Sequence, residues 1–141
     1  MVRTLTAIVA TLAAACMAAC GGGSSQPESP LTDPAVVEQG KSIFRFDTFG
    51  DETQWTDTLR MHEVIRTAVD PTTALSVGLK VDAEALPAAV VQGIRDGSID
   101  LKSPATTVAL LKLDAVVGLK GTVEPINGTD TLTRVGITCA L

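Results

Sequence analysis

Apolar residues recur at helical spacing most clearly in residues 52–68. Two neighbouring stripes have members three or four positions apart, namely Met61, Val64, Ile65 and Ala68, and Trp55, Leu59 and His62. Side chains at this spacing share one face of a helix, so the pattern predicts one amphipathic helix. Asp70-Pro71 should end it, because the residue before a proline disfavours helical backbone. Residues 76–81 could form a short strand.

Capping residues mark other helices. Asp33-Pro34 and Ser103-Pro104 each place a residue that caps helices before a proline at the first helical position. These pairs predict helices that reach about residues 44 and 113. A further helix is predicted over residues 83–94, with one apolar side formed by Leu86, Val90 and Ile94.

The last part of the chain changes to an alternating pattern. Apolar and polar residues alternate in residues 117–123 and again from Thr131, which is the period of a half-buried strand. Asn127-Gly128 between them is typical of a two-residue hairpin turn. The apolar positions are Val117, Leu119, Val123, Val135, Ile137 and Cys139. The predicted fold class is therefore α+β, with short helices followed by a C-terminal β-hairpin.

The first nineteen residues have the features of a signal peptide. Arg3 precedes an apolar run over residues 5–19, which is too short to span a bilayer comfortably as a mature helix. The run ends in Met17-Ala18-Ala19-Cys20, which resembles a lipobox. We expect cleavage before Cys20 and lipid on its thiol. Cys16 offers a second cleavage position, and a plain signal peptide cut near Ala19 is the alternative.

Three segments follow from these patterns. Residues 1–19 form the signal peptide, residues 20–33 are rich in Gly, Ser and Pro and form a flexible tether, and residues 34–141 fold. The expected location is the cell envelope, with the protein facing the periplasm and anchored by lipid to the inner or outer membrane.

The charge balance narrows the expected partners. The chain has 11 basic and 16 acidic residues and a net charge of −5, which becomes −6 when Arg3 leaves with the signal peptide. Nucleic acid and anionic lipid surfaces are therefore not expected partners, because both attract clusters of Lys and Arg. We expect the membrane contact to run through the lipid on Cys20.

The aromatic residues lie close together in the sequence, beside an acidic stretch. Phe44, Phe46, Phe49 and Trp55 are expected to anchor the core, since aromatic side chains bury large apolar areas. The acidic residues are Asp47, Asp51, Glu52 and Asp57. They lack the tight alternation of oxygen ligands in a calcium loop, which favours a solvated loop with capping side chains.

Cys139 is the cysteine that remains once Cys16 leaves with the signal peptide and Cys20 carries the lipid. A single thiol in an oxidising compartment suggests a reactive role or pairing with another chain, and a small buried strand residue is the third interpretation. Cys139-Ala140-Leu141 matches the first three positions of Cys-x-x-Cys-His. In that motif two thiols form thioethers with haem c, and the histidine ligates the iron.

Residues 38–141 resemble a family of bacterial c-type cytochromes. The segments that carry the resemblance are Gly40-Lys41-Ser42-Ile43-Phe44-Arg45-Phe46-Asp47-Thr48-Phe49-Gly50-Asp51, Trp55-Thr56-Asp57-Thr58-Leu59, Ser103-Pro104-Ala105-Thr106-Thr107 and Val135-Gly136-Ile137-Thr138-Cys139-Ala140-Leu141. The first of them is also similar to the opening helix of bacterial dihaem cytochrome c peroxidases. The chain departs from the family by lacking the second cysteine and the histidine. We therefore expect it to be an N-terminal fragment that ends inside the motif.

The resemblance implies a larger, mainly α-helical parent that carries haem c and transfers electrons to a periplasmic redox partner, or uses haem as a peroxidase does. Cys139 would be the first haem c thiol. His62, the only histidine, would be an axial iron ligand or a haem-propionate contact, or else a histidine packed at a helix edge. The fragment alone is expected neither to hold haem stably nor to be an enzyme.

A second interpretation belongs to another class. The chain could be a small envelope lipoprotein that acts as a non-enzymatic binding or structural module, with the hairpin closing its domain. The sequence contains no nucleophile elbow, phosphate-binding glycine loop or His-Glu-x-x-His pair. One histidine and one remaining thiol also supply too few ligands for zinc.

Overall fold

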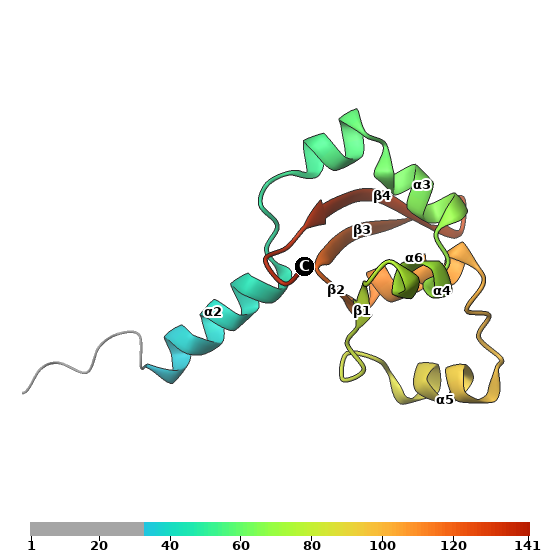
Figure 1. Cartoon of the computed structure of the whole chain (residues 1–141), viewed down its shortest axis with the longest axis horizontal. Helices are drawn as coiled ribbons and strands as arrows, with labels where there is room; N and C mark the ends of the chain where they lie inside the picture. The colour runs from blue at the N-terminus through green and yellow to red at the C-terminus, as the bar shows by residue number, and fades with distance from the viewer. Residues whose placement is uncertain (1–32) are drawn as a thin grey trace, which may run out of the picture. The chain divides into compact units, whose positions relative to one another are not determined.

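Helices occupy most of the first two thirds of residues 33–141, and an antiparallel hairpin ends the chain (Figure 1). These are the residues that the computed structural model describes, and almost all of them belong to one compact unit, Val37–Leu141. The arrangement confirms the α+β class. The predicted signal peptide, most of the tether, and Cys16 and Cys20 lie outside the described residues.

The elements follow one another along the chain with short connections. They are α2 (Pro34–Phe46), the π-helix η2 (Thr53–Thr58), α3 (Met61–Ala68), α4 (Pro71–Ser76), β1 (Lys80–Val81), α5 (Ala88–Asp96), α6 (Pro104–Lys112), β2 (Val116–Val117), β3 (Leu119–Ile126) and β4 (Thr129–Ile137). No helix within residues 33–141 is both long enough and apolar enough to cross a membrane.

The predicted hairpin is confirmed. β3 pairs with β4, and the turn residues Asn127 and Gly128 have φ angles of 52° and 79°, as a type I′ turn requires. The register shifts between Thr122 and Val123, which is a β-bulge. An extra residue on β4 allows Leu132 and Val135, three positions apart, both to be buried. A second, two-stranded sheet joins β1 to β2.

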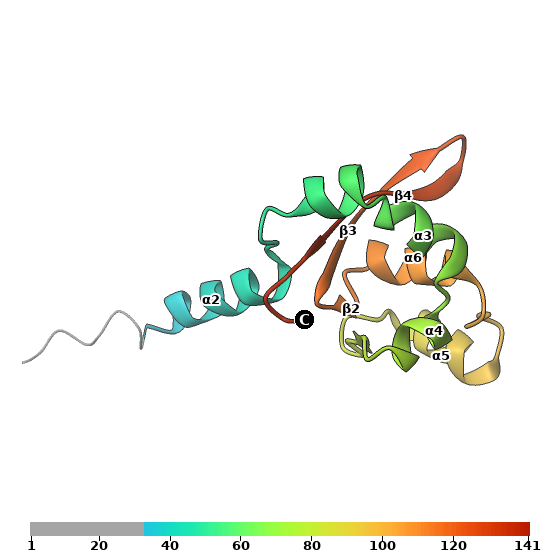
Figure 2. The same cartoon turned by 45° about the horizontal axis from the view of Figure 1, so that its top comes forward.

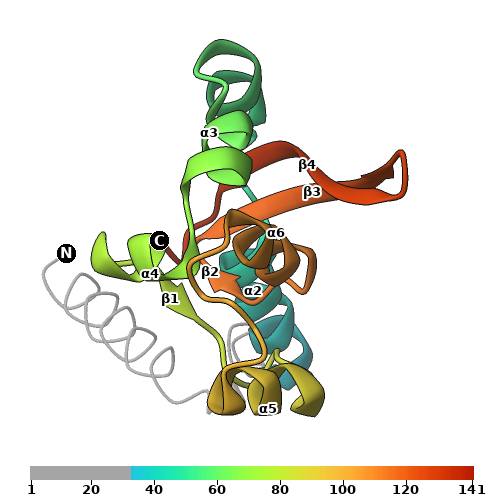
Figure 3. The same cartoon turned by 90° about the vertical axis from the view of Figure 1, so that its right-hand side faces the viewer.

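The core lies between the hairpin and two helices. α3 and α6 contact each other, α6 contacts β3, and α3 contacts β4, as Figure 2 shows. The buried apolar cluster comprises Ile65, Val108, Leu110, Leu111, Val116, Leu132 and Val135. Gly121 on β3 permits this packing, because a Cβ atom there would lie 2.8 Å from Leu132 Cδ1 and 3.1 Å from Leu111 Cβ. In Figure 3, α5 lies away from the hairpin, with α6 between them.

The helix predicted over residues 52–68 is broken in two. η2 ends at Thr58, and Arg60 adopts a left-handed backbone conformation with φ 54° before α3 begins. The Arg60 guanidinium donates to both carboxylate oxygens of Glu63, at 3.0 and 2.6 Å, beside this break. The apolar stripe that joined Trp55 to His62 in the prediction therefore does not exist as one helical face.

Two further boundaries differ from the prediction. α5 begins at Ala88 rather than at residue 83, because Pro87 takes the N-cap position with extended backbone, and Gly97 ends the helix in a left-handed conformation. Only Lys80–Val81 of the stretch 76–81 is a strand. Ser76 ends α4, whose first turn is capped by the Asp70 side chain, and a turn over residues 77–79 leads into the strand. α2 and α6 begin at their predicted prolines.

The prediction that the phenylalanines anchor the core is wrong. Phe44, Phe46 and Phe49 are 55%, 40% and 66% exposed, and within α2 no residue is buried. Trp55 does pack against the core cluster, as predicted.

Candidate functional site

Cys139 lies two residues beyond the end of β4, and its side chain is exposed. The prediction that it continues the apolar face of Val135 and Ile137 is wrong, because β4 ends at Ile137 and Thr138 is the buried residue that follows. The interpretation of Cys139 as a small buried residue is therefore also wrong. The thiol is accessible to a reagent or to a covalent partner.

The backbone before the thiol is fixed on both sides. The Phe49 amide donates to the Ile137 carbonyl at 3.0 Å, and the Thr138 amide donates to the Gly118 carbonyl at 3.0 Å. The Thr138 side chain is almost completely buried. These contacts hold the residue before Cys139 in place.

The residues after the thiol turn back onto the β2–β3 connection. The Leu141 amide donates to the Thr138 carbonyl at 3.3 Å, and the Ala140 amide donates to Thr138 Oγ1 at 3.4 Å. Gly118 has φ 91°, and a Cβ atom there would lie 2.6 Å from the Leu141 Cα atom. Glycine is thus required at position 118, and Cys139 sits at the corner of a tight, supported turn.

The acidic loop before η2 supports the same turn. Asp51 accepts hydrogen bonds from the Trp55 indole at 2.7 Å and from the Ile137 amide at 3.1 Å. Thr48 donates to the Glu52 carboxylate at 2.6 Å. Carboxylates engaged in this way serve as local caps and braces, as expected. Within residues 33–141 no group of three or more His, Cys, Asp or Glu residues is placed to hold a metal ion.

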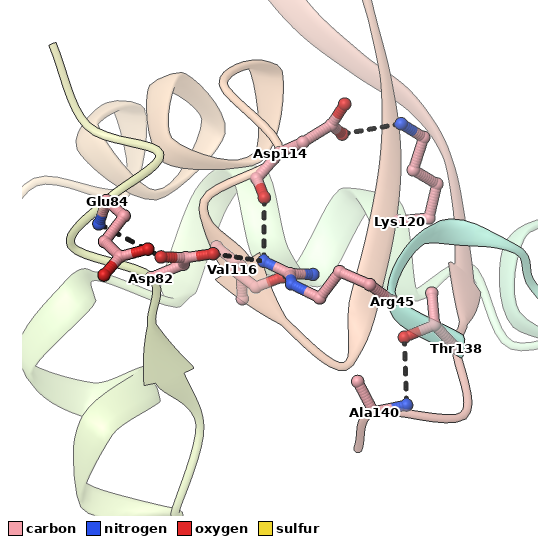
Figure 4. Close-up of polar contacts among 8 residues, drawn as sticks. All are labelled: Arg45, Asp82, Glu84, Asp114, Val116, Lys120, Thr138 and Ala140. Carbon is pink, nitrogen blue, oxygen red and sulfur yellow. Dashed lines mark hydrogen bonds and ion pairs between the residues drawn. The ribbon is translucent and has the colours of Figure 1, made fainter. Parts of the chain in front are cut away.

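Arg45 connects α2 to the turn between α6 and β2 (Figure 4). Its guanidinium donates to the Asp114 carbonyl at 2.9 Å and to the Val116 carbonyl at 3.3 Å, and lies 3.8 Å from the Asp82 carboxylate. The Arg45 side chain is only 17% exposed. Two backbone carbonyls at a sharp turn thus gain a charged donor, which strengthens these bonds relative to neutral ones.

Lys120 and Phe46 lie next to the Arg45 guanidinium and the turn that it binds. Lys120 pairs with the Asp114 carboxylate at 2.7 Å. The Phe46 ring lies 5.0 Å from the Arg45 guanidinium carbon and 5.9 Å from Lys120 Nζ, at cation–π distance. Sequence reasoning missed Arg45 and Asp114, since 69 positions separate them and no local pattern links them.

His62 is the second residue of α3 and is partly buried. Its Nδ1 atom is shielded from solvent and has no hydrogen-bond partner within the described part of the chain. The structure places His62 on α3 and Cys139 beyond β4, and no hydrogen bond among the described residues connects them.

Two adjoining apolar depressions lie beside the turn. An open pocket of about 310 Å³ is lined by Trp55, Met61, Ile65, Val69, Val77, Leu79, Leu119, Val135 and Ile137. A second, of about 200 Å³, is lined by Val77, Gly78, Leu79, Lys80, Val117, Ala140 and Leu141. They share Val77 and Leu79, and the two residues after Cys139 line the second. The sequence indicated only an ambiguous stretch around Val77 and gave no sign of this surface.

Comparison with known proteins identified no relative of this chain. No protein-family model, no curated protein and no solved structure matches the chain.

Proposed function

We propose that the chain is the N-terminal part of a lipid-anchored c-type cytochrome of the cell envelope, and that Cys139 forms the first thioether to haem c. The observation that carries the proposal is the exposed thiol at the corner of a braced turn, beside an apolar surface. A porphyrin presents a broad apolar face, and a side chain that attaches it must be accessible and held in place. The parent would transfer electrons to a periplasmic redox partner, or use haem as a peroxidase does.

The described residues fit haem c only in part. They supply one thiol and one imidazole, whereas the attachment motif uses two thiols and an imidazole adjacent to the second. The second thiol and the proximal iron ligand would have to come from residues after Leu141. Bound haem would supply one-electron chemistry, while the protein's residues would fix its position and set its polarity and water access.

The part of this chain in haem binding would be positional. Thr138 and Gly118 fix the backbone on which the thiol stands, and Val77 and Leu79 offer apolar contact beside it. His62 remains a candidate for an iron ligand or a propionate contact, supported by its shielded and unpartnered Nδ1 atom. A His62→Ala variant of the full-length protein with an unchanged haem spectrum would exclude that role.

The codons after Leu141 and a haem stain test the proposal together. The codons should encode Cys-His. The natural gene, expressed with cytochrome-maturation machinery, should give a protein band with covalent haem. Cys139→Ser should lose most of that haem, because one thioether is removed, whereas the neighbouring Ala140→Ser should keep it. The 141-residue chain alone should retain none. A stop codon after Leu141, or a natural product without covalent haem, would overturn the cytochrome proposal.

The apolar pocket favours a second candidate, a small envelope lipoprotein that binds an apolar molecule. Its volume of about 310 Å³ is at the lower end of the range for small-molecule sites. In that case a genuine stop codon follows Leu141, and the protein enhances the fluorescence of an apolar dye. Val77→Asp should abolish the enhancement, because Val77 lines the pocket. Val64→Asp should leave it unchanged, since Val64 is exposed on α3 outside the pocket.

A further inference from the structure

The apolar face of α2 has no partner among the described residues. Its members follow the spacing of an amphipathic helix and are 41–55% exposed; we call them the α2 stripe, Val36, Val37, Ile43 and Phe44. Gly40 lies on the same face and adds no side chain between them. A helix at the surface of a folded unit normally turns such a face inward.

The contacts of α2 explain why the stripe stays uncovered. At 100° per residue, Arg45 lies about 140° around the helix from the centre of the α2 stripe. Arg45 is the residue that hydrogen-bonds to the carbonyls of Asp114 and Val116. The helix is therefore held to the folded unit by its polar side, and the stripe is directed away from that contact.

The chain before α2 indicates what covers the stripe. Cys20 and Pro34 are 14 positions apart. An extended chain of that length reaches at most about 50 Å. If Cys20 carries acyl chains, as proposed above, the tether keeps α2 near the membrane surface. This raises the local concentration of α2 at the bilayer, so that a weak apolar contact can form.

The charges of α2 suit a neutral bilayer surface. Its exposed ion pair, Lys41 with Glu38 at 3.3 Å, is balanced, and the sequence as a whole is acidic. Attraction to anionic headgroups is therefore not the driving force. An apolar stripe that includes a phenylalanine can bind at the boundary between headgroups and acyl chains by apolar burial.

We infer that α2 is an interfacial helix that lies along the membrane surface, with the α2 stripe inserted at the headgroup boundary. This inference rests on the proposed lipid anchor at Cys20. The sequence predicted a membrane contact through lipid alone, and α2 would be a second contact that orients the folded unit on the bilayer.

The test places an environment-sensitive dye on each side of α2. In a Cys139→Ser background of the 141-residue chain, Ile43→Cys and Glu38→Cys are labelled separately on the mature, acylated protein in phosphatidylcholine vesicles. At position 43 the emission should shift to the blue, and lipids with a quencher near the top of the acyl chain should quench it. At position 38, on the polar side, neither change should occur. Each variant carries a single dye on α2, so the variant labelled at position 38 is a matched control for the variant labelled at position 43.

The outcomes separate this inference from the anchor on which it rests. Acylated protein whose dye at position 43 stays in water overturns the interfacial helix and leaves the anchor standing. A blue shift at position 43 without quenching by lipid identifies a protein partner or a second copy, and also overturns it. A mature protein whose mass shows no acyl chains overturns the anchor and the inference together.

Discussion

α2 and α6 both carry apolar residues but lie in opposite environments. In the region of α6 and the hairpin, Leu111 and Leu132 are completely enclosed, whereas Ile43 on α2 is 46% exposed. α6 is held by apolar burial against β3 and α3. α2 is held by the hydrogen bonds of Arg45. The comparison shows that apolar residues on a helix indicate a need for a partner, and do not indicate whether the same chain provides it.

The difference has energetic consequences. A fully buried leucine contributes about 1.5–3 kcal/mol through removal of its apolar surface from water. α2, with 13 residues and no buried side chain, gains little of that energy. Isolated helices of this length are marginal in water. The stability of α2 should therefore depend on Arg45 and on what covers the α2 stripe.

Truncating one aliphatic side chain in each environment gives the largest effect. Leu132→Ala should lower the free energy of unfolding by about 2–5 kcal/mol, because it leaves a cavity under α6. Ile43→Ala is the matched change on α2 and should cost less than about 1 kcal/mol, since the side chain already contacts water. Urea unfolding followed by tryptophan fluorescence measures both. Equal losses would mean that Ile43 is covered by the folded unit itself, and would erase the contrast between the two helices.

Removing the polar attachment of α2 should have an intermediate effect. Arg45→Met keeps the length of the side chain but leaves the carbonyls of Asp114 and Val116 without their charged donor. The expected loss is about 1–3 kcal/mol. Amide hydrogen exchange should also quicken along α2 more than along α6.

Lys41 provides the control for Arg45. Its pair with Glu38 is exposed, and such pairs contribute about 0–1 kcal/mol. Lys41→Met should therefore change neither the unfolding free energy nor the exchange of α2 appreciably. If Arg45→Met behaves in the same way, α2 is not held through Arg45, and the orientation assigned to its stripe loses its basis.

The sequence predicts the packed region better than the α2 region for a physical reason. Ser103-Pro104 and Asn127-Gly128 are local signals whose effect on the backbone does not depend on distant residues, and both mark the elements they predicted. The exposure of the phenylalanines depends on what faces them. An aromatic residue indicates a need for burial, and neither composition nor spacing says where its partner lies.

The candidate site also combines features that have a local sequence signal with features that depend on distant residues. Its thiol was identified from residue type and spacing, but its exposure depends on where β4 ends. Neither the turn over Gly118 nor the Arg45 attachment has a local signal, because each joins segments far apart in the chain. The kink at Arg60 was missed for the opposite reason. It is local, but the Arg60–Glu63 pair beside it has a spacing that also fits a continuous helix, so the residue types do not mark the break.

The smallest expected effect concerns the cap of α4. It tests whether a local hydrogen bond adds to the stability that apolar burial gives the packed region. The Asp70 carboxylate caps α4 by accepting from the Thr73 amide at 2.8 Å and the Thr73 hydroxyl at 3.0 Å. The Thr73 amide, with a smaller contribution from the hydroxyl, holds the pKa of Asp70 below its ordinary value, while partial desolvation opposes this. A carboxylate with a lowered pKa stabilises the fold at pH values above its unfolded pKa, near 4, and loses that contribution as the pH falls through the folded pKa.

Asp70→Asn keeps an acceptor at the cap but removes the titration. The variant should be slightly less stable than the natural protein at pH 7, and the difference should vanish toward pH 2. NMR titration of the Asp70 carboxyl adds a sharper comparison. Thr73→Ala removes the hydroxyl and keeps the amide, so the pKa of Asp70 should rise but stay below its ordinary value. A complete return to that value would show that the side chain, and not the backbone at the start of α4, supplies the cap.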